Sequence, residues 1–71
     1  MEVFEIVDNY GNSYDYIRAN NQREALCMYL MQHEELEDTM LWKSKDWKQD
    51  WQLAKYDNEE NYLYARIARR F

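Results

Sequence analysis

The 71-residue sequence has no proline, one glycine, one cysteine and no long apolar run. Because Cys27 is the only cysteine, no disulfide can form within the chain, which suits a reducing cytosol. No apolar stretch approaches the roughly 20 residues that span a bilayer, and the acidic, alternating start lacks the basic region of a secretory signal. These absences predict a soluble cytoplasmic protein that does not contact a membrane.

The sequence also lacks the motifs of common catalytic and cofactor-binding sites. It has no glycine-rich phosphate loop, no nucleophile elbow and no EF-hand spacing. A zinc site needs three or four ligands, and one cysteine with one histidine cannot begin one. On an ideal helix Cys27 and His33 would lie about 120° and roughly 9 Å apart, too far for a nucleophile–base pair. We therefore expect no enzyme activity, no metal and no cofactor, and interpret His33 as a packing residue at the edge of the core.

Composition alone leaves order and disorder open. A formal charge of −5 and few Val, Ile, Leu and Phe residues favour disorder, whereas seven Tyr and three Trp favour an aromatic-rich core. A chain of this length forms one domain and buries only about 60% of its unfolded surface. We expect a single folded domain over residues 1–71, to which a partner or self-association would add stability.

Charge is distributed unevenly along the chain. Residues 1–41 hold nine acids and two bases, a net of −7, while residues 42–71 hold seven bases and five acids, a net of +2. The two halves could complement each other across the fold, or the acidic half could present a negative face to a basic partner.

The clearest element is a helix expected over Asn20–Asp38. The side chain of Asn21 can accept from the free amides of the first turn, and Glu24 can reach back as in a capping box. At 100° per residue one broad apolar face forms, and it requires cover from the rest of the chain. This face comprises Ala25, Leu26, Tyr29, Leu30, His33 and Leu36.

Before this helix the sequence predicts a β-hairpin, with strands Glu2–Asp8 and Ser13–Ala19 joined by a loop around Gly11. After it the signals are weaker, and Met40–Trp42 could close the helix or begin a short strand. Residues 51–68 favour a second hairpin with arms at Trp51–Lys55 and Leu63–Ala68, because Tyr and Ile favour strands. A C-terminal helix capped by Asn58, with Leu63, Ile67 and Phe71 spaced at i+4, is the alternative.

The expected fold class is therefore α+β. An N-terminal hairpin, one central helix and a C-terminal hairpin (ββαββ) place the helix on one antiparallel sheet. The alternative, with a helical C-terminal segment, is ββαα.

Two runs carry a resemblance: Val-Phe-Glu-Ile-Val-Asp-Asn-Tyr-Gly-Asn-Ser-Tyr at residues 3–14 and Ile-Arg-Ala-Asn-Asn-Gln-Arg-Glu-Ala-Leu at residues 17–26. From Val3 to about Leu30 the chain resembles the ββα start of small accessory proteins of bacteriophages and mobile elements. That group includes inhibitors of host factors, among them anti-CRISPR proteins, so the resemblance implies an inhibitor or regulator. It covers under half the chain and assigns no functional residue.

Two surfaces are candidate binding sites. On the outer side of the helix, flexible Met and Cys side chains lie among acids, an arrangement that can adapt to a partner, unless the second half of the chain covers them. Its residues are Glu24, Cys27, Met31, Glu34, Glu35 and Asp38. A strip of Trp and Lys could instead stack and attract nucleic acid. It comprises Trp42, Lys43, Lys45, Trp47, Lys48 and Trp51, and Asp46 and Asp50 interrupt it.

The sequence thus favours a non-catalytic acidic protein that binds a host macromolecule with a basic surface, as an inhibitor, regulator or nucleic-acid mimic. A small homo-oligomeric structural protein is the alternative. Direct nucleic-acid binding is the least favoured, because the overall charge is negative.

Overall fold

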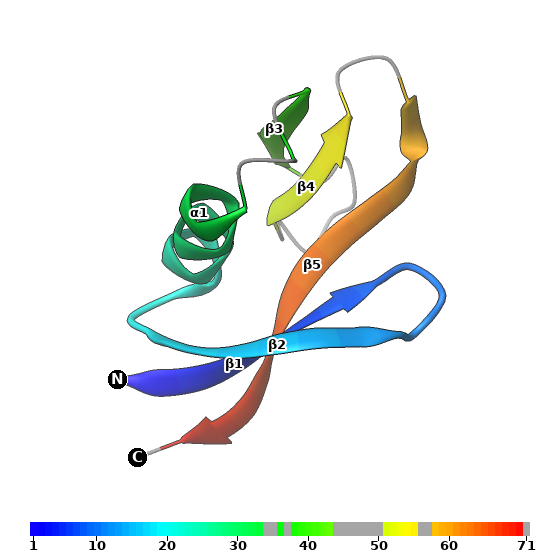
Figure 1. The fold of residues 1–71 in the computed structure, drawn as a ribbon. Coiled ribbons are helices and arrows are strands. Elements are labelled where there is room, and N and C mark those ends of the chain that lie inside the picture. The colour runs from blue at the N-terminus through cyan, green and yellow to red at the C-terminus, as the bar shows by residue number, and fades with distance from the viewer. Residues whose placement is uncertain (34–35, 37, 44–50, 56–57, 71) are drawn as a thin grey trace.

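In a computed structural model, which describes residues 1–33, 36, 38–43, 51–55 and 58–70, five antiparallel strands form one sheet with a single helix against it. Figure 1 shows the long strand β5 running through the middle of the molecule. The strands lie in the order β2-β1-β5-β4-β3. Their bounds are β1 Glu2–Asp8, β2 Ser13–Ala19, β3 Thr39–Lys43, β4 Trp51–Lys55 and β5 Asn58–Arg70, and helix α1 spans Gln22–Gln32.

The expected ββαββ topology is wrong, because the described chain runs ββαβββ. The additional strand is β3, where Leu41 pairs with Leu53 of β4. The ββαα alternative is also wrong, since residues 58–70 form a strand. Strand β5 is longer than the expected arm because it pairs with two neighbours: Leu63 lies opposite Leu53 of β4, and Ile67 lies opposite Phe4 of β1. Pairing with β1 thus extends a segment whose local pattern is ambiguous.

The N-terminal hairpin forms as the sequence predicts. Strands β1 and β2 pair in antiparallel register, with Phe4 opposite Ile17 and a bulge between Ile6 and Val7. Gly11 has φ +93°, a conformation that residues with a side chain rarely adopt. Its backbone N–H donates to the carbonyl of Asp8 at 3.1 Å, which closes the turn.

The start of α1 is also as expected, but its end is not. The side-chain oxygen of Asn21 accepts from the backbone N–H of Glu24 at 2.8 Å, so Asn21 is the N-cap. The helix ends at Gln32 instead of Asp38, and the N–H of His33 donates to the carbonyl of Leu30 at 3.2 Å. The last turn contains no basic residue to complement the helix dipole, and an acidic run follows it, so continuation of the helix is disfavoured.

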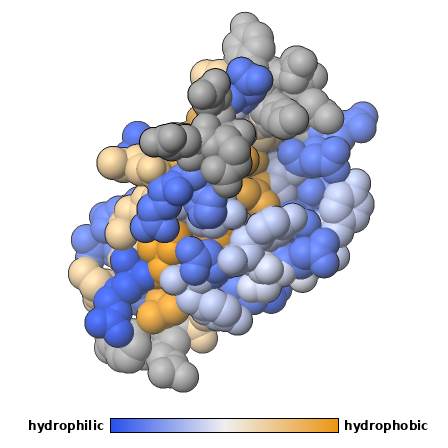
Figure 2. Space-filling model, in the orientation of Figure 1, coloured by the Kyte–Doolittle hydropathy of each residue, from blue (hydrophilic) through white to orange (hydrophobic). Residues whose placement is uncertain are grey.

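The core lies between α1 and one face of the sheet. From the helix, Ala25, Leu26 and Tyr29 of the expected inner face are buried and Leu30 packs at the margin of the core, as does Leu36, which follows the helix. The sheet supplies Phe4, Ile6, Ile17, Ala19, Leu53 and Ala65. The space-filling view in Figure 2 shows hydrophobic side chains between hydrophilic ones across the visible face.

Helix α1 has 11 residues, and no helix of the described part of the chain is long and apolar enough to cross a membrane.

Candidate functional site

The turn between β1 and β2 is built around the carboxylate of Asp8, whose residue is 8% exposed. Its Oδ1 accepts from the backbone N–H groups of Tyr10 and Asn12, each at 2.9 Å. Its Oδ2 accepts from the Nδ2 of Asn12 at 3.0 Å and from the hydroxyl of Tyr14 at 2.8 Å. A carboxylate offers about four acceptor positions, so these four donors use the capacity of Asp8.

These hydrogen bonds keep Asp8 ionised. Burial of the carboxyl raises its pKa, but the bonds from Asn12, Tyr14 and Tyr10 outweigh that effect and lower the pKa to about 2. The same contact raises the pKa of Tyr14, because its hydroxyl donates to the carboxylate. Asp8 therefore holds a permanent negative charge at neutral pH.

Asn9 attaches this turn to the distant strand β5. Its backbone N–H donates to the carbonyl of Tyr62 at 3.1 Å, and its side-chain oxygen accepts from the N–H of Tyr62 at 3.0 Å. Its Nδ2 donates to the carbonyl of Glu60 at 3.0 Å. The hydroxyl of Tyr10 donates to Oδ1 of Asn61 at 2.8 Å. Four contacts thus hold the turn in place against β5.

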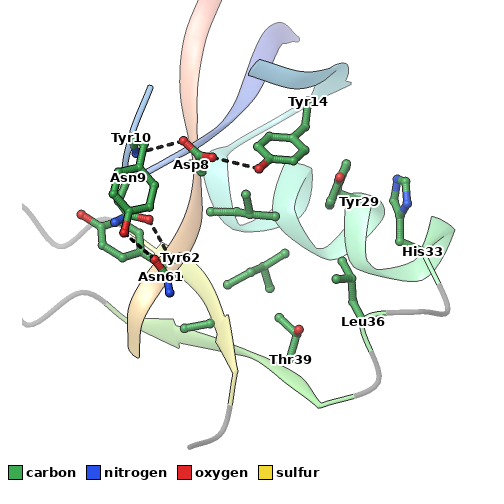
Figure 3. Close-up of a pocket in the computed structure, with 13 residues that line it drawn as sticks. Asp8, Asn9, Tyr10, Tyr14, Tyr29, His33, Leu36, Thr39, Asn61 and Tyr62 are labelled. Atoms are coloured by element: carbon green, nitrogen blue, oxygen red, sulfur yellow. Dashed lines mark hydrogen bonds between the residues drawn. The ribbon is translucent and has the colours of Figure 1, made fainter. Parts of the chain in front are cut away.

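A cavity of about 560 Å³ opens between this turn and the C-terminal end of α1. Figure 3 shows Tyr10, Asn61 and Tyr62 on one side, with Tyr14, Tyr29 and His33 on the other. The rings of Tyr29 and His33 lie 4.1 Å apart between centroids. The described residues around the cavity are Asp8, Asn9, Tyr10, Tyr14, Tyr29, His33, Leu36, Thr39, Leu53, Ala54, Asn61, Tyr62 and Leu63.

The same hairpin exposes three tyrosines, which we call the tyrosine surface: Tyr10, Tyr14 and Tyr16, at 74%, 53% and 60% exposure. The hydroxyl of Tyr16 donates to Glu5 at 3.2 Å, and Glu5 forms an ion pair with Arg66 at 2.8 Å. The hydrogen bond from Arg66 lowers the pKa of Glu5. Strand β1 and the turn thus hold the tyrosine surface in place.

The site predicted on the helix is only partly brought together. Met31 is 82% exposed and Asp38 is exposed in a turn after the helix, whereas Cys27 is half-buried. Glu24 lies 3.3 Å from the side-chain amide of Asn20. Glu34 and Glu35 lie outside the described residues. This site stays a prediction.

The predicted Trp–Lys strip does not form one surface within the described residues. Lys43 lies opposite Trp51 on neighbouring strands, so these two share a face, and Trp42 projects to the other face. The indole N–H of Trp42 is buried without an acceptor among the described residues. The guanidinium carbon of Arg23 lies 5.3 Å from the centre of a Trp51 ring, and the Lys43 Nζ lies 6.0 Å away. Lys45, Trp47 and Lys48 lie outside the described residues.

No local pattern in the sequence indicates the cavity. The spacing of Asp8 and Gly11 indicated a turn, and the number of tyrosines was plain, but nothing local indicated that residues 61 and 62 would meet residues 9 and 10. No three His, Cys, Asp or Glu side chains of the described ranges are grouped as a metal site requires.

Comparison of the chain with protein-family models, with curated proteins and with solved structures found no match. The likeness of residues 3–30 to phage accessory proteins therefore stays a resemblance.

Proposed function

We propose that this is a non-catalytic binding protein that engages a protein partner with a basic surface, as an inhibitor or regulator. The observation that carries the proposal is the tyrosine surface, three exposed aromatic rings on one hairpin. Tyrosine is enriched at binding interfaces because it supplies a large contact area at little cost in conformational entropy.

The order of the hairpin supports the proposal. Asp8 fixes the turn through four hydrogen bonds, and Asn9 and Tyr10 attach it to β5. A surface that is ordered before binding loses less entropy when the partner docks. The net charge of −5 favours a basic partner and accelerates its approach at low salt.

A capture experiment with matched variants tests this function. The double variant Tyr10→Ser/Tyr16→Ser removes two rings of the tyrosine surface, and Met31→Ser/Asp38→Lys alters the surface predicted on the helix. We expect wild type to capture basic proteins from a host lysate in a salt-sensitive manner, and the tyrosine variant to lose them. Equal capture by wild type and the tyrosine variant, with loss only in the helix variant, would assign binding to the helix.

Self-association is the second candidate, and the position of β2 favours it. Among the described strands β2 pairs only with β1, so it is an edge of the sheet, and its seven residues include no proline. Such an edge can pair with another chain. Light scattering at micromolar concentration tests this: a monomer removes the candidate, and a dimer that Tyr16→Pro abolishes supports it.

A further inference from the structure

We propose that the cavity beside Asp8 binds an organic cation without N–H donors, that is, a quaternary ammonium group. The inference does not depend on the proposed function, because its test uses a small cation and no macromolecular partner. It rests on the composition of the cavity wall, on the charge of Asp8 and on the hydrogen bonds that Asp8 already accepts.

The size and lining of the cavity suit a small amphipathic ligand. Its volume of about 560 Å³ falls within the roughly 300–1,000 Å³ of small-molecule sites. Leu36, Leu53 and Leu63 supply apolar wall, and four tyrosines supply rings. Aromatic rings attract cations through their negative faces, and groups of rings are a known means of holding quaternary ammonium groups.

The charge of the site selects a cation over a neutral ligand. Asp8 is ionised, and the described residues that line the cavity include no Lys or Arg, with His33 as their one basic side chain. The ion pair of Arg66 is with Glu5, not with Asp8. A negative charge that is stabilised by hydrogen bonds still attracts a cation, and the attraction is strengthened where water is displaced.

At the carboxylate, the existing hydrogen bonds favour a cation without N–H groups. All four acceptor positions of Asp8 are used by Tyr10, Asn12 and Tyr14, and the side-chain oxygen of Asn61 accepts from Tyr10. A primary ammonium brings three donors and a guanidinium brings five, and a donor that faces the carboxylate without a vacant acceptor position there is costly. A quaternary ammonium group brings none.

Titration of the intact chain with choline, followed by ¹H–¹⁵N NMR, tests the proposal. The neutral isostere 3,3-dimethylbutan-1-ol serves as the matched control for charge, and n-propylammonium and guanidinium serve as the controls for N–H donors. We expect saturable shifts centred on the cavity residues, with choline at least about threefold tighter than each control. Absence of saturable binding, or equal affinity for the neutral isostere, overturns the proposal.

The role of the aromatic rings is tested first, with a variant of Tyr62. Tyr62→Leu removes a ring but keeps an apolar wall, so we expect choline to weaken at least about threefold while the neutral isostere does not. Tyr64→Leu, two residues along β5 and not among the described lining residues, removes a ring that lies 6.1 Å from that of Tyr62, so it controls for an indirect effect and should weaken choline binding less than Tyr62→Leu does. Equal loss in both variants argues against the cavity.

Tyr14→Phe keeps the ring and removes the hydroxyl that donates to Asp8. One acceptor position of the carboxylate becomes free, so n-propylammonium should gain at least about threefold relative to choline. A constant ratio of the two affinities, with a well-dispersed spectrum, overturns the assignment of donor selectivity to Asp8.

The quaternary group could belong to a small molecule or to a trimethylated lysine on a protein. A short peptide with trimethyllysine and its unmodified twin distinguish the two sources. Tighter binding of the modified peptide than of choline supports a protein source, and binding of choline alone supports a small molecule. Binding of the unmodified peptide as tightly as its twin overturns the proposal.

Discussion

The two ends of helix α1 each combine aromatic rings with charge, but they do so in different ways. At the N-terminal end, the exposed residues Arg23 and Lys43 lie near the ring of Trp51, which packs at the margin of the core. Near the C-terminal end, Tyr14 and Tyr29 lie with the carboxylate of Asp8 around a cavity. The first cluster is a pair of surface contacts with solvated cations, whereas the second contains a buried charge held by four hydrogen bonds. We therefore expect the Asp8 end to carry more of the stability.

The largest expected effect comes from the middle of the helix, which supports both ends. Leu26 is fully buried in the core, so Leu26→Ala should lower the free energy of unfolding by about 2–5 kcal/mol. Urea unfolding measures the loss. Met31→Ala, at an exposed position of the same helix, is the control and should stay within about 0.5 kcal/mol of wild type.

The comparison of the two ends is tested most directly by Asp8→Ala against Arg23→Ala. Removal of the Asp8 carboxylate leaves the N–H groups of Tyr10 and Asn12 without their acceptor. Removal of Arg23 should cost only about 0.5–1 kcal/mol, the usual worth of an exposed cation–ring contact. We expect the thermal midpoint to fall several times further in the Asp8 variant. Equal losses would contradict the difference between the ends.

The pH dependence of stability should report on Asp8. Its pKa is lowered to about 2 in the folded protein, below the roughly 3.9 of an unfolded Asp. The stabilisation is therefore complete above about pH 4 and lost as the pH falls toward 2. The pKa of Glu5 is also lowered, so Asp8→Asn should flatten the acid loss in part, while Glu5→Gln removes the other contribution. Identical acid profiles of wild type and Asp8→Asn would contradict the assignment.

A small effect, close in size to that of Arg23→Ala, is expected at the N-terminal cap. Asn21→Ala removes the acceptor of the Glu24 N–H and should cost about 1 kcal/mol, whereas Asn21→Ser should retain most of the stability. Urea unfolding distinguishes these values from the larger loss in Leu26→Ala. A cost for Asn21→Ala as large as that of Leu26→Ala would mean that the N-terminal end contributes more than its contacts indicate.

The first 30 residues could be predicted from the sequence to a large extent. Of the following residues, the preferred second hairpin is present as β4, with the expected bounds Trp51–Lys55, paired with β5, whereas the full length of β5 and the place of β3 in the sheet could not be predicted. Gly11 and Asn21 act on neighbours within a few residues, so the turn and the helix start have local causes. In contrast, Leu63 and Ile67 suit a helix face as well as a strand, and only their pairing with Leu53 and Phe4 decides between the two. Strand β3 has the same origin, since its register comes from β4.

The sequence by itself determined the N-terminal hairpin, the helix cap, the buried face around Leu26 and the acidic charge, because each depends on composition or on residues close in the chain. The tertiary structure decided the five-stranded order, the early end of α1 and the cavity. Asn9 meets Tyr62 and Tyr10 meets Asn61 across more than 50 residues. Contacts at that separation leave no local pattern, and they place Asp8 in the cavity wall rather than in a turn alone.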